Sequence, residues 1–122
     1  MQTFFFDTYA LYELIIGSEN YKLYQKGAGI LFTRFQLMEL HYAFMRTIGQ
    51  AKADEIYDAL VPFVIGISDH TIKKANALKY FYRKRKLSYI DCIGYVLARK
   101  NGFPFLTGDE QFRDLEGVEF VK

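Results

Sequence analysis

Three aspartates occupy positions where chemistry is expected in an α/β protein. Asp7 directly follows the apolar run 2–6, and Asp109 follows the run 103–107 after one glycine. Asp91 stands in the first turn of a predicted helix. In open parallel sheets the ligand-binding crevice lies beyond the carboxyl ends of the strands, which is where Asp7 and Asp109 are predicted to lie. If the helix that carries Asp91 begins at the same edge, three carboxylates converge.

Each of these acids also has a structural explanation. Asp7 is a good N-cap for a helix that begins after it, which is worth about 1 kcal/mol. Asp91 and Ser88 form a pattern similar to a capping box, and Asp109 is a possible cap for a following short helix. Glu39 lies opposite the apolar stripe of its predicted helix, so periodicity alone indicates solvated surface. The combination, rather than any single residue, favours a functional site.

A cluster of carboxylates has a definite chemical consequence. Carboxylates at one crevice repel one another, and without compensation some of them stay protonated. A divalent cation removes that penalty, and Mg²⁺ takes oxygen ligands, usually one or two carboxylates together with waters. Such a site activates water and stabilises negative charge on a phosphate. Acids with few basic residues among them therefore suggest hydrolysis of a phosphodiester.

Strands and helices are predicted to alternate along the chain. The spacing predicts short strands at 2–6, 30–33, 63–67, 103–107 and 118–121, and helices at 8–16, 19–26, 35–48, 51–60, 69–86, 88–101 and 110–112. Alternation of this kind favours an α/β fold, specifically a three-layer α/β/α sandwich with a mostly parallel central sheet. The near-continuously apolar strands suit a sheet that is covered on both faces.

Length and composition indicate one globular domain over residues 1–122. Half of the residues are hydrophobic (51%) and 25% are charged, and the net charge of +2 excludes no partner class. The single cysteine, Cys92, cannot form an internal disulfide, which favours a reducing compartment. The N-terminus lacks the basic region of a signal peptide, and no apolar run approaches the roughly 18 residues of a membrane span. We therefore expect a soluble, cytoplasmic protein.

One basic stretch has the composition of a nucleic-acid contact. Residues 79–86 interleave five cations with three aromatic rings. Cations hold phosphates and rings stack on unpaired bases, so we predict RNA contacts from Arg83, Lys84, Arg85 and Lys86. The alternative is structural: cations at a helix C-terminus complement the helix dipole, and the rings could belong to the core.

Four segments of the chain resemble the PIN-domain ribonucleases, especially the toxins of VapBC-type toxin–antitoxin pairs. The segments are 4–8, 33–39, 87–92 with Ala98 and Gly102 downstream, and 105–109 with Phe112 after it. They occur in the family's order from one end of the chain to the other. The middle of the chain, 50–86, carries no signature of the family.

The resemblance implies a site of Asp7, Glu39, Asp91 and Asp109 that binds Mg²⁺ or Mn²⁺, with the Thr107 hydroxyl in support. It makes Glu39 a site residue, against the periodicity. It further implies an endoribonuclease that hydrolyses RNA, a cognate antitoxin as partner, and a homodimer. The alternative is a PIN-like module that binds RNA or protein without cleaving, which the intact set of four acids disfavours.

Other chemistries have weaker support. The segment 7–9 resembles the start of a haloacid-dehalogenase-type phosphatase motif, but that motif needs a second aspartate where Tyr9 stands. His41 and His70 lack partners at zinc spacing, and we expect both to be packing or surface residues. Cys92 has no histidine in an obvious base position and is expected to be a small buried apolar residue.

Overall fold

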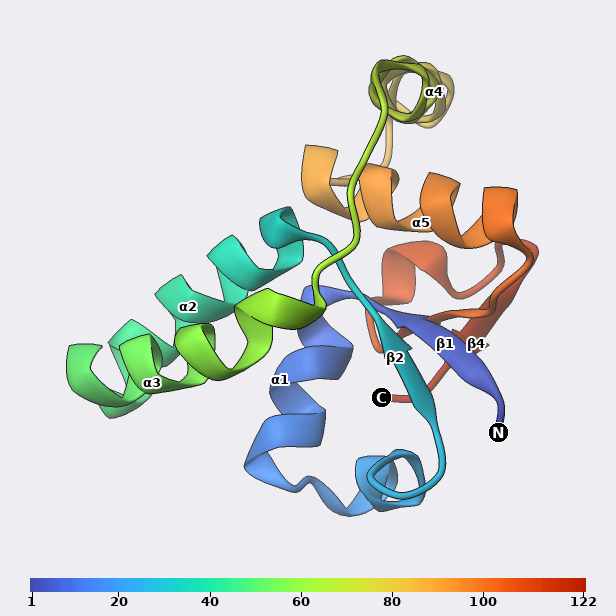
Figure 1. The fold of residues 1–122 in the computed structure, drawn as a ribbon. Coiled ribbons are helices and arrows are strands. Elements are labelled where there is room, and N and C mark those ends of the chain that lie inside the picture. Colours follow the sequence, from blue (N-terminus) through green and yellow to red (C-terminus); the bar gives the residue numbers. More distant parts are fainter.

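The computed structural model describes all of residues 1–122 and alternates strands with helices (Figure 1). The strands are β1 (Thr3–Phe6), β2 (Gly29–Leu31), β3 (Phe105–Thr107) and β4 (Val118–Phe120). The α-helices are α1 (Thr8–Ile16), α2 (Arg34–Ile48), α3 (Gln50–Leu60), α4 (Asp69–Phe81) and α5 (Tyr89–Asn101). Three short 3₁₀ turns complete the chain: η1 (Glu19–Tyr24), η2 (Val61–Phe63) and η3 (Glu110–Phe112). None of the helices is both long enough and apolar enough to cross a membrane.

The four strands form one fully parallel sheet in the order β2-β1-β3-β4. In the register, Phe5 of β1 lies opposite Leu31 on one side and Phe105 on the other. Because all strands run the same way, the carboxyl ends of β1 and β3 lie side by side at one edge. Helices cover both faces of the sheet, which confirms the predicted α/β/α sandwich.

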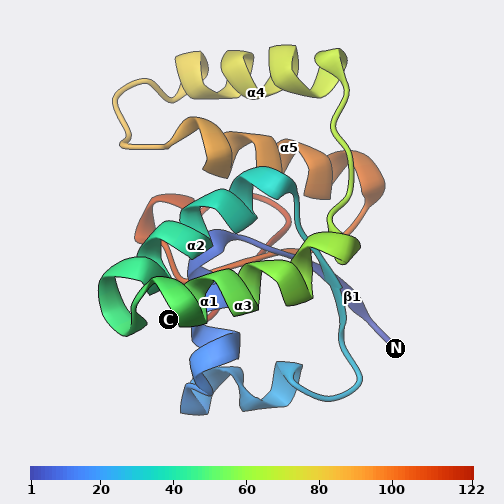
Figure 2. The same ribbon diagram turned by 60° about the vertical axis from the view of Figure 1, so that its left-hand side comes forward.

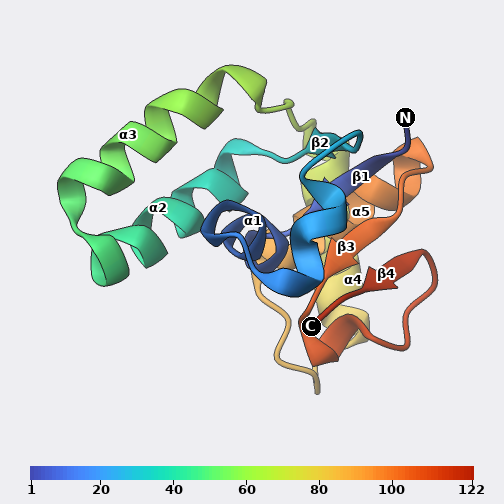
Figure 3. The same cartoon turned by 90° about the horizontal axis from the view of Figure 1, so that it is seen from below.

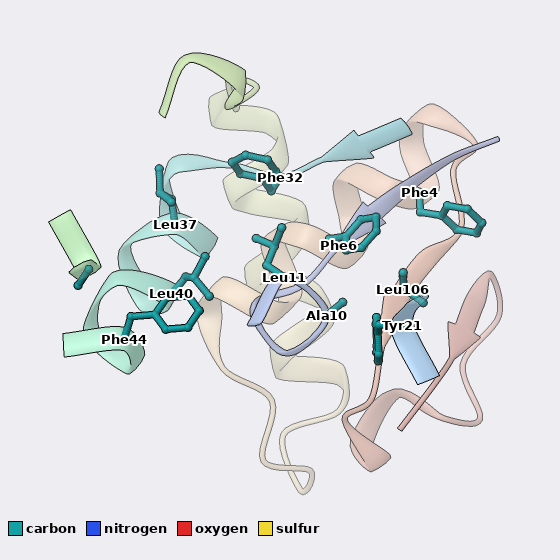
Figure 4. Packing of buried hydrophobic residues seen from close by; sticks show 11 residues of the cluster. Phe4, Phe6, Ala10, Leu11, Tyr21, Phe32, Leu37, Leu40, Phe44 and Leu106 are labelled. Carbon is teal, nitrogen blue, oxygen red and sulfur yellow. The ribbon is translucent and has the colours of Figure 1, made fainter. Parts of the chain in front are cut away.

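The three consecutive phenylalanines of β1 serve two different cores. Side chains alternate across a strand, so Phe4 and Phe6 face the layer of α1 and α2, where Leu11 and Leu40 are buried with them (Figure 4). Phe5 faces the opposite layer and packs with Phe105 and residues of α5. An uninterrupted apolar run is therefore required here, because neither face of the strand meets water.

The α5 helix lies close against the sheet, and α4 lies outside α5 (Figure 2). The close approach depends on Gly94, because a Cβ there would come within 2.8 Å of the Phe5 ring. The first turn of α5 is thereby held near the carboxyl ends of the strands. That position matters for Asp91.

Several predicted elements differ from the structure. The strand predicted at 63–67 is wrong: η2 precedes it, and Ile65 forms only a single parallel bridge with Thr33. Pro62 lies within η2, where its fixed backbone and missing N–H suit a turn. The helix predicted at 19–26 is the shorter 3₁₀ turn η1.

The helix predicted at 69–86 ends at Phe81, so the cations of 83–86 lie in the connection to α5 rather than on a helix. The chain must reverse there, because Leu87 is buried in the core of the next layer. In α2, Met45 and Ile48 lie on the apolar stripe of the helix but are 38% and 47% exposed. Figure 3 shows the reason: α2 and α3 reach past the sheet, so the last turn of α2 has no layer beneath it.

Candidate active site

Asp7 is the most buried acid of the molecule, with 2% of its surface exposed. It follows β1 and caps α1, and its Oδ1 accepts a hydrogen bond of 2.8 Å from the backbone N–H of Ala10. Its Oδ2 accepts a hydrogen bond from the hydroxyl of Thr107, the last residue of the neighbouring strand β3. Both carboxylate oxygens are therefore fixed, one by the following helix and the other by the adjacent strand.

Thr107 connects Asp7 to Asp109. Its Oγ1 donates to Asp7 and accepts the backbone N–H of Asp109 at 3.0 Å. The Asp109 carboxylate in turn caps η3 by accepting the backbone N–H of Gln111 at 2.9 Å. The predicted capping role and the predicted position at the crevice both hold for Asp109.

Asp91 and Glu39 reach the same edge from two helices. Asp91 lies in the first turn of α5, where the Ser88 hydroxyl accepts its backbone N–H at 3.0 Å. Glu39 of α2 is half-buried, and the Thr8 hydroxyl donates to its Oε1 at 2.6 Å. Thr8 directly follows Asp7, so this hydrogen bond ties Glu39 to the start of α1.

Asp7, Asp91 and Asp109 line one hollow of about 380 Å³ at the carboxyl edge of the sheet. Glu39 does not line it, but its negative charge contributes to the electrostatics of Asp91. The structure thus brings three of the four predicted acids together and places the fourth beside them. Thr107, which was predicted to support the site, donates a hydrogen bond to Asp7.

Two acids of this hollow, Asp7 and Asp91, have raised pKa values. The pKa of Asp7 is raised to about 8, chiefly because burial removes water from its carboxylate. The charges of Asp91 and Asp109 add to the rise, while the hydrogen bonds from Thr107 and Ala10 oppose it. The pKa of Asp91 is raised to about 6, again chiefly by burial, with contributions from the charges of Glu39 and Asp109.

The donor set fits a hard divalent cation. Every candidate ligand is a carboxylate oxygen, and a cation would compensate the charges that raise these pKa values. No three acidic, histidine or cysteine side chains lie close enough together to hold a metal ion as a group. Mg²⁺ commonly takes one or two carboxylates and keeps several waters, so an open arrangement suits it better than a protein cage.

Three further residues line the hollow that sequence reasoning did not select: Tyr9, Glu110 and Lys122. Lys122 forms an ion pair of 3.2 Å with Glu110. The Tyr9 ring covers the backbone at Gly108, where a Cβ would overlap the ring. Glu110 and Tyr9 are close in sequence to Asp109 and Asp7, which is the signal that could have indicated them.

The remaining candidates have structural roles, as expected. His41 accepts or donates a 2.7 Å hydrogen bond with Asp54, which joins α2 to α3, and His70 is exposed. Cys92 is fully buried in the core beneath α5, and burial raises its thiol pKa to about 11. A thiol in that state is a poor nucleophile.

The cations of the basic stretch 79–86 differ in their binding partners. The Arg85 guanidinium forms two hydrogen bonds to the Asp114 carboxylate, at 2.7 and 2.9 Å, and a third to the carbonyl of Gln111. Lys84 and Lys86 are exposed, and Arg83 lies over the Tyr80 ring. The four cations predicted to contact RNA are therefore not equivalent.

The chain belongs to the PIN-domain family, since the family model for the PIN domain matches residues 4–118. No curated protein matches it in sequence.

Solved structures share its fold. The VapC20 toxin of Mycobacterium tuberculosis, described as cleaving the sarcin–ricin loop, superposes with a TM-score of 0.78 at 19% identity, covering 98% of this chain and 99% of that one. A toxin–antitoxin complex from Klebsiella pneumoniae has a TM-score of 0.68 at 20% identity and covers 95% of both chains. VapBC2 from Rickettsia felis, bound to a promoter DNA fragment, has a TM-score of 0.69 at 14% identity and covers 99% of this chain and 100% of that one. At these identities the likeness establishes the fold.

Proposed function

We propose that this protein is a metal-dependent endoribonuclease that hydrolyses RNA phosphodiester bonds. The observation that carries the proposal is the convergence of Asp7, Asp91 and Asp109 in one hollow, where the pKa values of Asp7 and Asp91 are raised. Such shifts mark carboxylates that are held together for a ligand of opposite charge. Carboxylates repel the negative charge of a phosphate. A cation bound between the acids and the phosphodiester would remove that repulsion.

In this proposal Asp7 and Asp91 hold Mg²⁺ or Mn²⁺ most directly, and Glu39 and Asp109 complete the cluster through the ion or its waters. The bound cation supplies a water of lowered pKa and stabilises negative charge on the phosphate. The chain's own contribution is orientation. The Thr107 hydroxyl and the Ala10 N–H fix the Asp7 carboxylate, and the Thr8 hydroxyl fixes Glu39.

We further propose that the nuclease is the toxin of a toxin–antitoxin pair. Support comes from two solved proteins of the same fold, one described as a toxin–antitoxin complex and the other as a toxin. The partner would be a cognate antitoxin that competes with RNA for the acidic hollow. Coexpression with the cognate antitoxin should give a complex without ribonuclease activity; a complex that still cleaves RNA would contradict this role.

The nuclease proposal is tested by incubating a mixed RNA pool with the purified chain in Mg²⁺ and, separately, in EDTA. We expect new RNA ends in Mg²⁺ and none in EDTA. Intact RNA under both conditions would contradict the proposal and would favour the non-cleaving binding module. Cleavage that persists undiminished in EDTA would contradict the metal dependence.

We also propose a homodimer. An apolar hollow of about 350 Å³ lies between α1, β2 and η2, and its exposed members include Ile15, Ile30 and Phe63. Exposed apolar groups of this kind mark interaction surfaces. Sedimentation at micromolar concentration should give about twice the chain mass, and a monomer there would contradict the dimer. Phe63→Ser should shift the population toward monomer.

A further inference from the structure

A second hollow lies where the end of α4 meets the start of α5. Its volume is about 410 Å³, and it is lined by Asn76, Lys79, Tyr80, Arg83 and Tyr89. Asn76, Lys79 and Tyr80 form one stripe along α4, because they are spaced by three and four residues. Arg83 lies in the turn that directly follows α4. No acidic side chain lines it. It therefore differs in character from the hollow that holds the aspartates.

The two rings of this hollow are exposed rather than part of the core. Tyr80 and Tyr89 expose 68% and 65% of their surface. For Tyr80, which belongs to the basic stretch 79–86, a place in the core is therefore wrong. Each ring carries a cation against it. The Lys79 ammonium lies 4.8 Å from the centroid of the Tyr89 ring, and the Arg83 guanidinium carbon lies 4.6 Å from that of Tyr80.

The hollow is adjacent to the acids along the chain. Tyr89 is the first residue of α5 and precedes Asp91 by two residues, in the same helical turn. Lys79 is held in place because its ammonium donates to the carbonyl of Leu87, immediately before the cap of α5. Both hollows therefore border the first turn of α5, one at Tyr89 and the other at Asp91.

We propose that this hollow is a subsite for an unpaired nucleobase of single-stranded RNA, next to the phosphodiester that is cut. The inference rests on the proposed nuclease function. The base stacks on Tyr80 or Tyr89, the Asn76 amide offers one acceptor and two donors to the base edge, and Arg83 meets the backbone. The rings and the amide can contact a base, and the cations can contact its phosphate. No acidic side chain in the hollow would repel that phosphate. Bases in a duplex are already stacked and cannot enter.

The test replaces both rings by a side chain that keeps apolar bulk but cannot stack. The variant is Tyr80→Leu with Tyr89→Leu, and its matched control is Tyr80→Phe with Tyr89→Phe. Both are made in the Asp91→Asn background and assayed in EDTA to prevent turnover. The probes are an unstructured single-stranded RNA that contains one 2-aminopurine, and a fully paired RNA duplex.

We expect the leucine variant to bind the single strand about tenfold or more weakly, in line with loss of base–aromatic stacking. Duplex binding should be unchanged, and the quenching of 2-aminopurine on binding should disappear. The phenylalanine control should bind and quench as the parent does. Equal binding of the single strand by the leucine variant, or equal loss for single strand and duplex, would overturn the subsite. Because both rings are exposed, unfolding temperatures should agree among all three.

A cleavage assay separates this inference from the proposed function. With Asp91 restored and Mg²⁺ present, the leucine variant should show a raised KM for single-stranded RNA and an unchanged kcat. If the native chain cleaves no RNA, the proposed function fails, whatever the binding result. If the leucine variant cleaves with the native KM, the subsite fails and the proposed function stands.

Discussion

Two charged regions meet at the start of α5, and they are built in opposite ways. The acidic hollow is buried: Asp7 exposes 2% of its surface, and its two oxygens are held by Ala10 and Thr107. The stripe of cations and rings at the end of α4 is exposed, and each of its cations lies over a ring or binds a carbonyl.

The two regions differ in the free-energy cost of keeping their side chains charged. In the acidic hollow, burial and mutual repulsion raise the pKa values of Asp7 and Asp91, so their ionised forms destabilise the metal-free chain. In our proposal a bound cation would remove this penalty. The exposed stripe carries no comparable penalty. Substitutions in the hollow should therefore remove chemistry while sparing or stabilising the fold, and substitutions in the stripe should weaken binding alone.

The largest effect is expected from the acids themselves. Asp7→Asn and Asp91→Asn should each lower the cleavage rate by about a thousandfold or more, because several kcal/mol of transition-state stabilisation by the cation is lost. Asn is also a good N-cap, so α1 should remain intact in Asp7→Asn. Single-turnover cleavage measures the rate, with Asp58→Asn on the exposed side of α3 as the matched control. Near-native rates in either variant would show that the acids are not the site.

The second effect is on stability without metal. The pKa of Asp7 is about 8 in the folded chain and near 4 when unfolded, so between those values the folded state binds more protons. The contribution of Asp7 to stability is thus fully present below about pH 4 and is lost as the pH rises toward about 8.

Melting in EDTA across this pH range should give a falling unfolding temperature, with a smaller fall for Asp7→Asn. At pH 8 that variant should be at least as stable as the parent. A parent whose stability rises steadily from pH 5 to pH 8, with Asp7→Asn showing the same curve, would contradict the raised pKa.

A smaller effect is expected from the three cations of residues 83–86 that have no carboxylate partner. Replacing Arg83, Lys84 and Lys86 by Gln should reduce the slope of log K against log salt by roughly 0.7 for each phosphate of a single strand that these cations neutralise. Cleavage at saturating RNA should persist, because the acids are untouched. The matched control replaces the exposed Lys22, Lys26 and Lys52 on distant elements. The same slope in both triple variants would assign no RNA contact to Arg83, Lys84 or Lys86.

The smallest effect separates Arg85 from its neighbours. Arg85→Gln removes its two hydrogen bonds to Asp114, which join the connection before α5 to the chain after η3. A slightly lower unfolding temperature and an unchanged salt slope are expected. Asp114→Asn should lower the unfolding temperature similarly. A lower slope with unchanged melting would instead make Arg85 an RNA contact.

The two regions also differ in how many of their contacts could be predicted from the sequence. Asp7, Asp91 and Asp109 were predictable because strand ends and helix starts are local features, and the parallel sheet brings such ends to one edge. Glu39 was not predictable from periodicity, because its hydrogen bond comes from Thr8, 31 residues away. The engagement of Arg85 by Asp114, 29 residues further on, has the same long-range origin.

Two elements predicted from the local sequence pattern differ from the structure. The run 63–67 is as apolar as a strand, yet η2 before it leaves only Ile65 to pair. The helix predicted to reach 86 stops at Phe81, because Leu87 must return to the core. Both outcomes depend on how neighbouring layers pack, which the local sequence does not encode.

The most direct test of the account is the binding of Mn²⁺ to the metal-free chain, followed by electron paramagnetic resonance. The native chain should bind the ion, and Mg²⁺ should displace it. Asp7→Asn and Asp91→Asn should each weaken the binding strongly, while Asp58→Asn should bind as the native chain does. Equal binding by all four proteins, or no binding by the native chain, would contradict the assignment of the acidic hollow as a metal site.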